Sequence, residues 1–169
     1  GQGTALLRMV SNLTLKSKKW SDGHLSAESI ISKTMGFEDI AIDGYSEDCK
    51  AYDTVVEAYR LDKEDPSRRG AIESASLIAA EIPLDLVSRA HEISLLHMEI
   101  NGNHNKNAHS DLMASKHLLA TASVIGAYNV AANLPEISNQ KRLSIKSKLS
   151  TMMEEIENML SITLDWSES

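Results

Sequence analysis

Cysteine, proline and aromatic residues are scarce in this chain of 169 residues. The single cysteine, Cys49, excludes a disulfide within the chain and argues against a cysteine-based metal site. It also fits a reducing compartment, so we expect the protein in the cytoplasm. Only 4% of the residues are aromatic, and three are proline. A core must therefore consist of Leu, Ile, Val, Met and Ala, a composition that favours packed helices.

Excess positive charge and long apolar runs are missing as well. The net charge is −7 at pH 7, which argues against a general nucleic-acid binder, because such a protein needs a basic field to engage phosphates. No apolar run approaches the ~20 residues of a membrane span. No basic segment followed by an apolar core opens the chain, so we see no secretion signal. We expect neither nucleic acid nor a membrane as a partner.

What the chain does contain is a series of helical patterns. Apolar residues recur at intervals of three and four, and no alternating Val-, Ile- or Thr-rich segment indicates a strand. We predict an all-α bundle of about five to six helices that forms a single domain over residues 1–169. We expect the tail, residues 165–169, to be frayed.

Glycine and proline mark the predicted helix boundaries. The region 26–61 has a helical pattern that Gly36 and Gly44 could interrupt. Asp65 is expected to cap the next helix. Pro83 is expected to end that helix and to open another, because the residue before a proline avoids the helical conformation.

The segment 110–134 is predicted to be the central helix. It is rich in Ala, Gly and Ser, which let neighbouring helices approach closely. We expect packing at the Asn129 end and function at the Asp111 end, which lie about 27 Å apart at 1.5 Å per residue. A stripe of polar and small residues runs along one side: Asp111, Ser115, Ala122, Gly126, Asn129 and Asn133.

The last helix carries a heptad-like seam with polar residues on its other faces. We expect this seam to pack lengthwise on another helix, in this chain or in a partner. Its members are Ile145, Leu149, Met152, Ile156 and Met159.

Side-chain amides and imidazoles crowd the segment before the central helix. Asparagine favours turns, and loops held by a rigid scaffold are where binding and catalysis concentrate. The segment is either such a site or a plain helix connection capped by Ser110. Its polar residues are Asn101, Asn103, His104, Asn105, Asn107, His109, Ser110 and Asp111.

Residues 105–111, Asn-Lys-Asn-Ala-His-Ser-Asp, resemble the Asn-Pro-Asn-Ala-x-Ser-Asp segment of the cyclodeaminase/cyclohydrolase family. Four other segments resemble blocks of this family in the same order: residues 9–20, 48–63, 82–84 and 126–134. The family includes the cyclodeaminase part of formiminotransferase-cyclodeaminase and the bacterial methenyltetrahydrofolate cyclohydrolases. The ordered set spans about residues 9–134, most of the chain.

The resemblance implies an all-helical protein that forms homodimers or larger homo-oligomers and acts on one-carbon folates. One family reaction converts 5-formiminotetrahydrofolate into 5,10-methenyltetrahydrofolate and ammonia. The other hydrolyses 5,10-methenyltetrahydrofolate to 10-formyltetrahydrofolate. The folate is the substrate, and no tightly bound cofactor and no metal are implied. Both reactions need the same kind of carboxylate, so the sequence does not separate the deaminase from the hydrolase.

The resemblance assigns catalysis to Asp111, as the general acid/base. Ser110 is expected to cap the helix that orients this carboxylate. Lys18 and Lys19 either meet the anionic glutamate tail or form a solvated basic helix end. Tyr59 either stacks on the pterin or belongs to the core. The predicted substrate-binding residues are Asn105, Asn107, Ser110, Lys18, Lys19, Asp53 and Tyr59.

The chain also departs from the family pattern. The family's Pro-Gly-Gly-Gly-Ser turn does not appear, and His104 and Lys106 replace its Gly and Pro. A non-catalytic helical oligomer, or a folate-binding remnant of the family, therefore stays open as an alternative. A weaker alternative is a metal site built from His97, Glu99, His104, His109 and Asp111.

Overall fold

The computed structural model describes residues 1–166, apart from the side chain of Glu38. These residues form six α-helices joined by turns and three short 3₁₀ helices, and they contain no strand. The prediction of an all-α chain with five to six helices is confirmed. The α-helices are α1 (Gln2–Leu15), α2 (His24–Lys33), α3 (Phe37–Arg60), α4 (Arg68–Ile100), α5 (His109–Asn133) and α6 (Asn139–Leu160). The 3₁₀ helices are η1 (Lys18–Gly23), η2 (Lys106–Ala108) and η3 (Leu134–Glu136).

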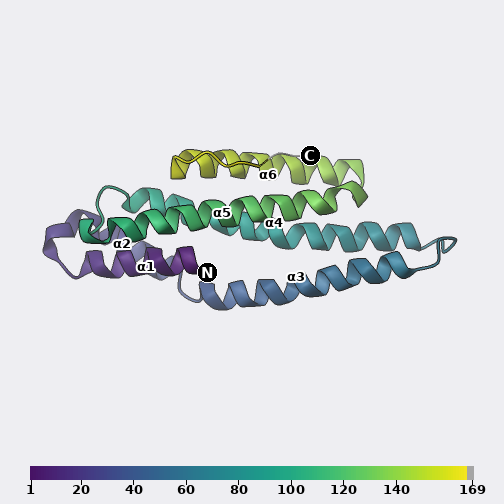
Figure 1. Ribbon diagram of the computed structural model, residues 1–169, viewed down its shortest axis with the longest axis horizontal. Helices are drawn as coiled ribbons and strands as arrows, with labels where there is room; N and C mark the ends of the chain where they lie inside the picture. Colours follow the sequence, from purple (N-terminus) through teal and green to yellow (C-terminus); the bar gives the residue numbers. More distant parts are fainter. Residues whose placement is uncertain (167–169) are drawn as a thin grey trace.

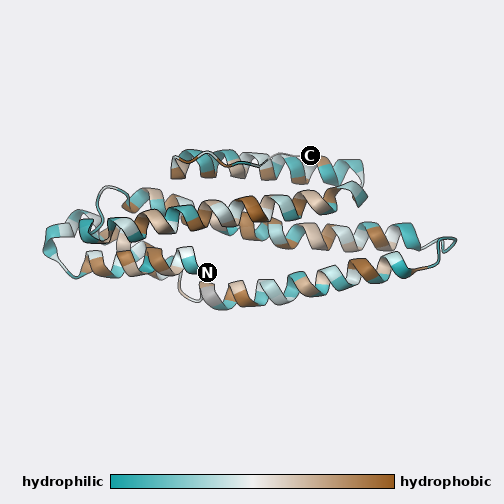
Figure 2. Cartoon of the chain, viewed as in Figure 1, coloured by the Kyte–Doolittle hydropathy of each residue, from teal (hydrophilic) through white to brown (hydrophobic). Residues whose placement is uncertain are grey.

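The helices form one elongated bundle (Figure 1). The long helices α4 and α5 pack against each other along the middle, and α6 lies along α4 and α5 on one side. On the other side, α1 and α2 cover one end of the bundle and α3 extends to the opposite end. Apolar and polar residues alternate along each helix (Figure 2), as expected of helices that bury one stripe. None of the described helices is long and apolar enough to cross a membrane.

Helix α4 continues through Pro83, so the predicted boundary there is wrong. Proline has no backbone N–H, which deprives the carbonyl four residues earlier, that of Ala79, of its usual donor. The amide nitrogen Nδ2 of Asn133 lies 3.3 Å from the Ala79 carbonyl oxygen and donates to it instead. A side chain on α5 thus supplies the hydrogen bond that α4 lacks.

Gly126 lets α4 and α5 come this close. A Cβ atom added at Gly126 would lie 2.7 Å from Val87 Cγ2 and 3.3 Å from the Pro83 carbonyl oxygen. Gly126 is buried, as are Ala127 and Val130 beside it. The prediction that this part of the small-residue stripe serves packing is confirmed.

Two other boundary predictions have different outcomes. Gly36, with φ of 75°, separates α2 from α3, as predicted, whereas Gly44 lies inside the unbroken α3. Asp65 does not cap α4, because that helix begins at Arg68. Its carboxylate instead accepts hydrogen bonds from the N–H and hydroxyl of Ser67, at 2.8 and 2.7 Å, within the preceding turn.

The end of the chain is packed as far as it is described. The predicted seam of α6 is buried in the core at Ile145, Leu149, Met152 and Ile156, beside α4. Residues 165 and 166 are not frayed, because Trp166 packs against the core and the Tyr128 hydroxyl donates to the Asp165 carbonyl, at 3.2 Å. The rest of the predicted frayed tail, residues 167–169, lies outside the described part.

Candidate functional site

Asn105 joins the loop before α5 to the end of α1. Its backbone N–H donates to the Thr14 hydroxyl at 3.0 Å, and its side-chain Nδ2 donates to the Leu13 carbonyl at 3.1 Å. Its Oδ1 accepts from the Asn107 N–H at 3.0 Å, which starts η2. Two of the family-like blocks, residues 9–20 and 105–111, therefore hold each other in place. Contact of Asn105 with substrate stays a prediction.

Asp111 lies in the first turn of α5, in a half-buried position. Within the described part of the chain, its carboxylate forms no hydrogen bond and no ion pair. The predicted cap is wrong: α5 begins at His109, and Ser110 makes no capping hydrogen bond. The turn closed by Asn105 leads through η2 directly into α5, so Ser110 is already the second helical residue. Asp111 thus lies where the helix dipole favours a negative charge.

Lys18 and Lys19 lie at the same end of the bundle as Asp111. Both are exposed in η1, which directly follows α1, and the Lys19 ammonium lies 4.9 Å from the centre of the Trp20 ring. Gly23, at the end of η1, packs so closely on Asn103 that an added Cβ atom would lie 2.3 Å from the Asn103 carbonyl oxygen. The structure therefore gathers six predicted residues at one end: Lys18, Lys19, Asn105, Asn107, Ser110 and Asp111.

The other two predicted residues, Asp53 and Tyr59, lie far from this end, on α3. A hydrogen bond with Glu136, which follows the last turn of α5, is the main cause that raises the pKa of Tyr59. Asp111 lies in the first turn of α5, and the two ends of that helix are separated by about 36 Å at 1.5 Å per residue. One copy of the chain therefore does not bring the eight predicted residues together.

Of the three histidines near the loop, one contacts the backbone and the other two contact each other. His97 is buried and its Nε2 donates to the Leu112 carbonyl at 2.9 Å. His104 is also buried, stacks on His109 with ring centres 5.2 Å apart, and shares a 3.1 Å hydrogen bond with it. Burial is the main cause that lowers the pKa of both His97 and His104. No group of three or more metal-ligating side chains gathers among the described residues, so nothing here supports the metal alternative.

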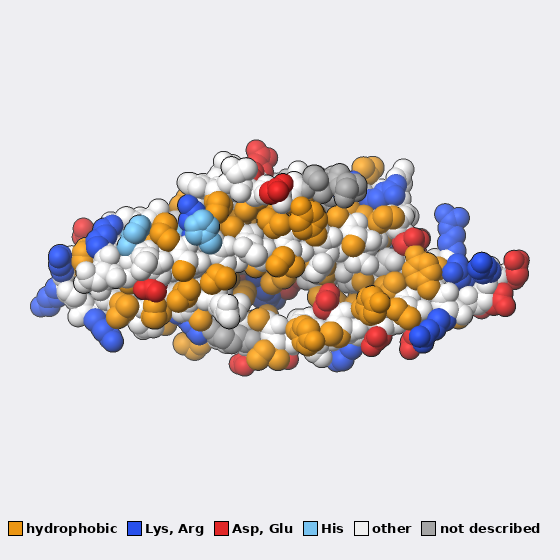
Figure 3. Space-filling view, viewed as in Figure 1, with side chains coloured by type: hydrophobic (Ala, Val, Ile, Leu, Met, Phe, Trp, Pro, Cys, Tyr) orange, Lys and Arg blue, Asp and Glu red, His pale blue; other side chains and the backbone are white. Residues whose placement is uncertain are grey.

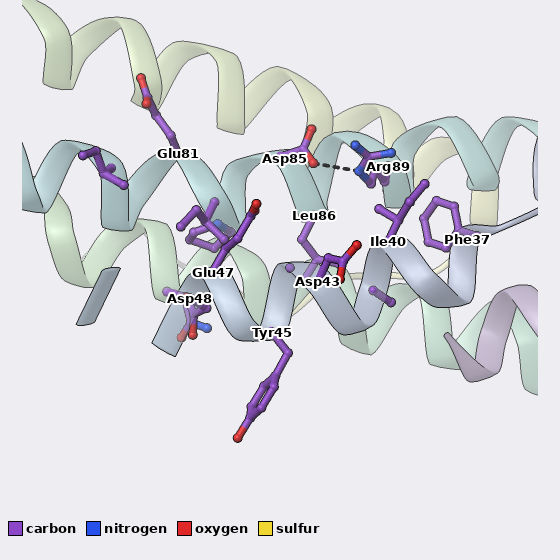
Figure 4. Close-up of a pocket in the computed structure, with 16 residues that line it drawn as sticks. Phe37, Ile40, Asp43, Tyr45, Glu47, Asp48, Glu81, Asp85, Leu86 and Arg89 are labelled. Carbon is purple, nitrogen blue, oxygen red and sulfur yellow. Dashed lines mark hydrogen bonds and ion pairs between the residues drawn. The ribbon is translucent and has the colours of Figure 1, made fainter. Parts of the chain in front are cut away.

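A groove of about 610 Å³ lies between α3, α4 and α5. It appears as a hollow on the face shown in Figure 3 and in close-up in Figure 4. Asp43 and Glu47 lie on its α3 side, and the Asp85 carboxylate pairs with the Arg89 guanidinium at 2.7 Å on its α4 side. In all, the groove is lined by five acidic side chains and one basic side chain.

None of the eight predicted site residues lines this groove. Asp48, Pro83 and Asn129 do, and each belongs to a different family-like block. Sequence reasoning missed the groove because it depends on which helices pack side by side. A signal was present, since Asp48, Pro83 and Asn129 matched the family but received no chemical role.

Comparison with known proteins places the chain in a family. Residues 1–154 match the family described as formiminotransferase-cyclodeaminase. A methenyltetrahydrofolate cyclohydrolase from Methylorubrum extorquens is 27% identical over 164 residues, which cover 94% of this chain and 75% of that protein. The crystal structure of a formiminotetrahydrofolate cyclodeaminase from Thermotoga maritima has the same fold, with a TM-score of 0.75 and 23% identity, over 94% of this chain and 81% of the other. The match over residues 1–154 shows that the chain belongs to the formiminotransferase-cyclodeaminase family.

Proposed function

We propose that this protein is an enzyme of one-carbon folate metabolism, with a tetrahydrofolate derivative as its substrate and no tightly bound cofactor. The reaction is either cyclodeamination of 5-formiminotetrahydrofolate to 5,10-methenyltetrahydrofolate, a lyase reaction, or hydrolysis of 5,10-methenyltetrahydrofolate to 10-formyltetrahydrofolate. The observation that carries this proposal is the family match over residues 1–154. The relatives named as cyclohydrolase and cyclodeaminase support the two reactions equally.

Both reactions pass through a tetrahedral carbon between two nitrogens and require proton transfer to nitrogen or oxygen. We assign this transfer to Asp111, acting as a general acid/base. Its half-buried carboxylate has no partner among the described residues, so it is available to a substrate. It lies in the first turn of α5, where the helix dipole favours a negative charge, and this position suits a base or a group that stabilises the cationic amidinium of the folate.

The other residues at this end would bind the substrate. Lys18 and Lys19 present exposed ammonium groups that suit the anionic glutamate tail. Asn107 and Ser110 have exposed side chains close to Asp111 in the chain. Asn105 acts mainly by holding the loop, because its amide is already hydrogen-bonded. We place the enzyme in the cytoplasm, as the single cysteine suggests.

The proposal is tested by following methenyltetrahydrofolate through its near-ultraviolet absorbance. One assay starts from 5-formiminotetrahydrofolate and the other from methenyltetrahydrofolate itself. Protein-dependent appearance in the first identifies a cyclodeaminase, and protein-dependent loss in the second identifies a cyclohydrolase. No change in either assay contradicts the proposal and favours the alternative of a non-catalytic oligomer. In that case, a folate-binding measurement separates a folate-binding remnant from a plain scaffold.

A further inference from the structure

The chain has two tryptophans, and the structure gives them different surroundings. Trp166 packs against the main hydrophobic core, whereas Trp20 belongs to neither apolar cluster of the described residues. Trp20 is half-buried in η1, and its indole N–H has no hydrogen-bond partner within the described part of the chain. This N–H is not enclosed, because His104 Nδ1 is the one buried side-chain N or O atom there that lacks a partner. Trp20 therefore offers an aromatic surface and an indole donor to solvent.

Contacts with neighbouring segments fix η1 at the end of the bundle where α5 begins (Figure 1). The Ser17 carbonyl accepts a hydrogen bond from the Trp20 backbone N–H at 3.0 Å, and it lies 3.1 Å from His24 Nε2. At the other end of η1, Gly23 packs directly against Asn103, in the loop before α5. The indole is thus attached to a segment whose position relative to that loop is set by packing.

Two lysines directly precede this aromatic ring in the chain. The side chains of Lys18 and Lys19 are exposed, and the Lys19 ammonium lies 4.9 Å from the centre of the Trp20 ring. This distance is that of a cation–π contact. A carboxylate that binds the Lys19 ammonium therefore lies next to the indole. A molecule that suits both groups carries an anionic group and an aromatic ring close together.

We propose that Trp20 stacks on the p-aminobenzoyl ring of the folate while Lys18 and Lys19 bind its glutamate tail. This role rests on the proposed function, which supplies the folate as substrate. In a folate, one amide bond joins the benzoyl ring to the glutamate, and the pterin lies beyond the opposite end of the ring. A group beside the lysines that bind the tail therefore meets the benzoyl ring before the pterin. The indole N–H suits the carbonyl of that amide as an acceptor.

The chemistry of the folate also favours Trp20 over Tyr59 as the aromatic contact. The carbon that reacts is bonded to the nitrogen that the benzoyl ring carries, so the ring and this carbon must bind at the same end of the bundle. Trp20 lies at the end that holds Asp111. Tyr59 contacts Glu136, which follows the last turn of α5, about 36 Å from the first turn that holds Asp111. A folate stacked on Tyr59 would place its reacting carbon far from Asp111 of the same chain.

Fluorescence titration of the full chain tests the stacking. In the variant Trp166→Phe, Trp20 is the sole tryptophan, so the indole emission reports on a ring that stacks on it. The probes are 5-formyltetrahydrofolate, p-aminobenzoylglutamate and 6-methyltetrahydropterin, which has neither benzoyl ring nor glutamate. After correction for absorbance, we expect the first two probes to quench the emission and the third to leave it unchanged. Quenching by the tetrahydropterin, or none by p-aminobenzoylglutamate, overturns the assignment of the benzoyl ring to Trp20.

Equilibrium dialysis of the same variant with 5-formyltetrahydrofolate distinguishes two kinds of failure. Binding without quenching overturns the role of Trp20 and leaves the proposed function standing. Absence of binding overturns both the proposed function and the role of Trp20. Neither measurement depends on turnover.

Steady-state kinetics with the folate substrates give a second test that leaves Trp166 unchanged. Trp20→Leu removes the aromatic ring but keeps an apolar side chain, and Trp20→Phe keeps a ring. We expect Trp20→Leu to raise KM about 10-fold with kcat within about 2-fold, and Trp20→Phe to keep KM within about 3-fold of the wild type. Tyr52→Leu changes an exposed tyrosine on α3 and is the matched control, with both constants unchanged. A wild-type KM in Trp20→Leu, or a fall in kcat alone, overturns the proposed contact.

Discussion

At the scale of single residues, the side chain of Asn105 holds the start of α5 in place. Asn105 uses its backbone N–H and both ends of its amide to join α1, its own loop and η2. Asp111, a few residues later, has a carboxylate without a partner in the described part. The family-like segment 105–111 therefore combines a residue that fixes the loop with a carboxylate that has no partner among the described residues.

The substitution Asn105→Ala should destabilise the protein by about 1–3 kcal/mol, because it leaves the half-buried Leu13 carbonyl and the Asn107 N–H without their partners. Urea unfolding measures this free energy. Asn103→Ala, at an exposed position of the same loop, is the matched control and should change stability by less than about 0.5 kcal/mol. Equal effects of the two substitutions would show that the amide of Asn105 does not hold the loop.

Stability should fall between about pH 6.5 and pH 5, because the folded state lowers the pKa of both His97 and His104. Below the unfolded pKa of about 6.5, the unfolded chain binds protons that these buried rings do not take up, so acid favours unfolding. Above that pH, neither ring contributes a pH dependence. Each ring adds a slope of at most about 1.4 kcal/mol per pH unit.

Unfolding free energies measured between pH 7.5 and pH 5 test this pH dependence. The double variant His97→Gln, His104→Gln should show a flatter profile than the wild type across that range. His117→Gln changes an exposed histidine and should leave the slope intact. A wild-type profile that is flat down to pH 5 would contradict the predicted effect of burial.

At the scale of the helices, one feature of the contact between α4 and α5 could be predicted from the sequence and another could not. The composition of residues 110–134 was enough to predict the central helix, because small residues have an obvious packing use. The passage of α4 through Pro83 was not predictable from local pattern. It depends on Asn133, 50 positions later, whose amide replaces the missing hydrogen bond to Ala79. The local sequence shows that a proline removes one backbone hydrogen bond. Only the folded structure shows which distant side chain replaces that bond.

This compensation predicts a coupling between Pro83 and Asn133. Asn133→Ala should cost about 1–2 kcal/mol in the wild type, because the buried Ala79 carbonyl loses its donor. In a Pro83→Ala background, the new backbone N–H supplies that donor, so the same substitution should cost much less. A double-mutant cycle by urea unfolding gives the coupling energy. Strictly additive effects would mean that the Asn133 amide does not replace the missing bond.

At the scale of the whole molecule, the fold class and the family could be predicted, but the distribution of the predicted site residues over the bundle could not. Periodicity and composition give an all-α bundle, and the ordered blocks give the family. The separation of Tyr59 from Asp111 follows from the length of α5 and from the side of the bundle on which α3 lies. The acidic groove likewise depends on three helices meeting. Both features are properties of helix pairing, which a single sequence does not specify.

The measurement that tests the central claim most directly compares the wild type with Asp111→Asn in the two folate assays, with folate binding measured on the same samples. Removing a general acid/base should lower turnover by about 10²–10⁴-fold while folate binding changes little. Glu92→Gln, an exposed acidic residue on α4, is the matched control and should keep full activity. Wild-type turnover in Asp111→Asn would contradict the proposed role of Asp111, because the carboxylate in the first turn of α5 would then have no part in the reaction.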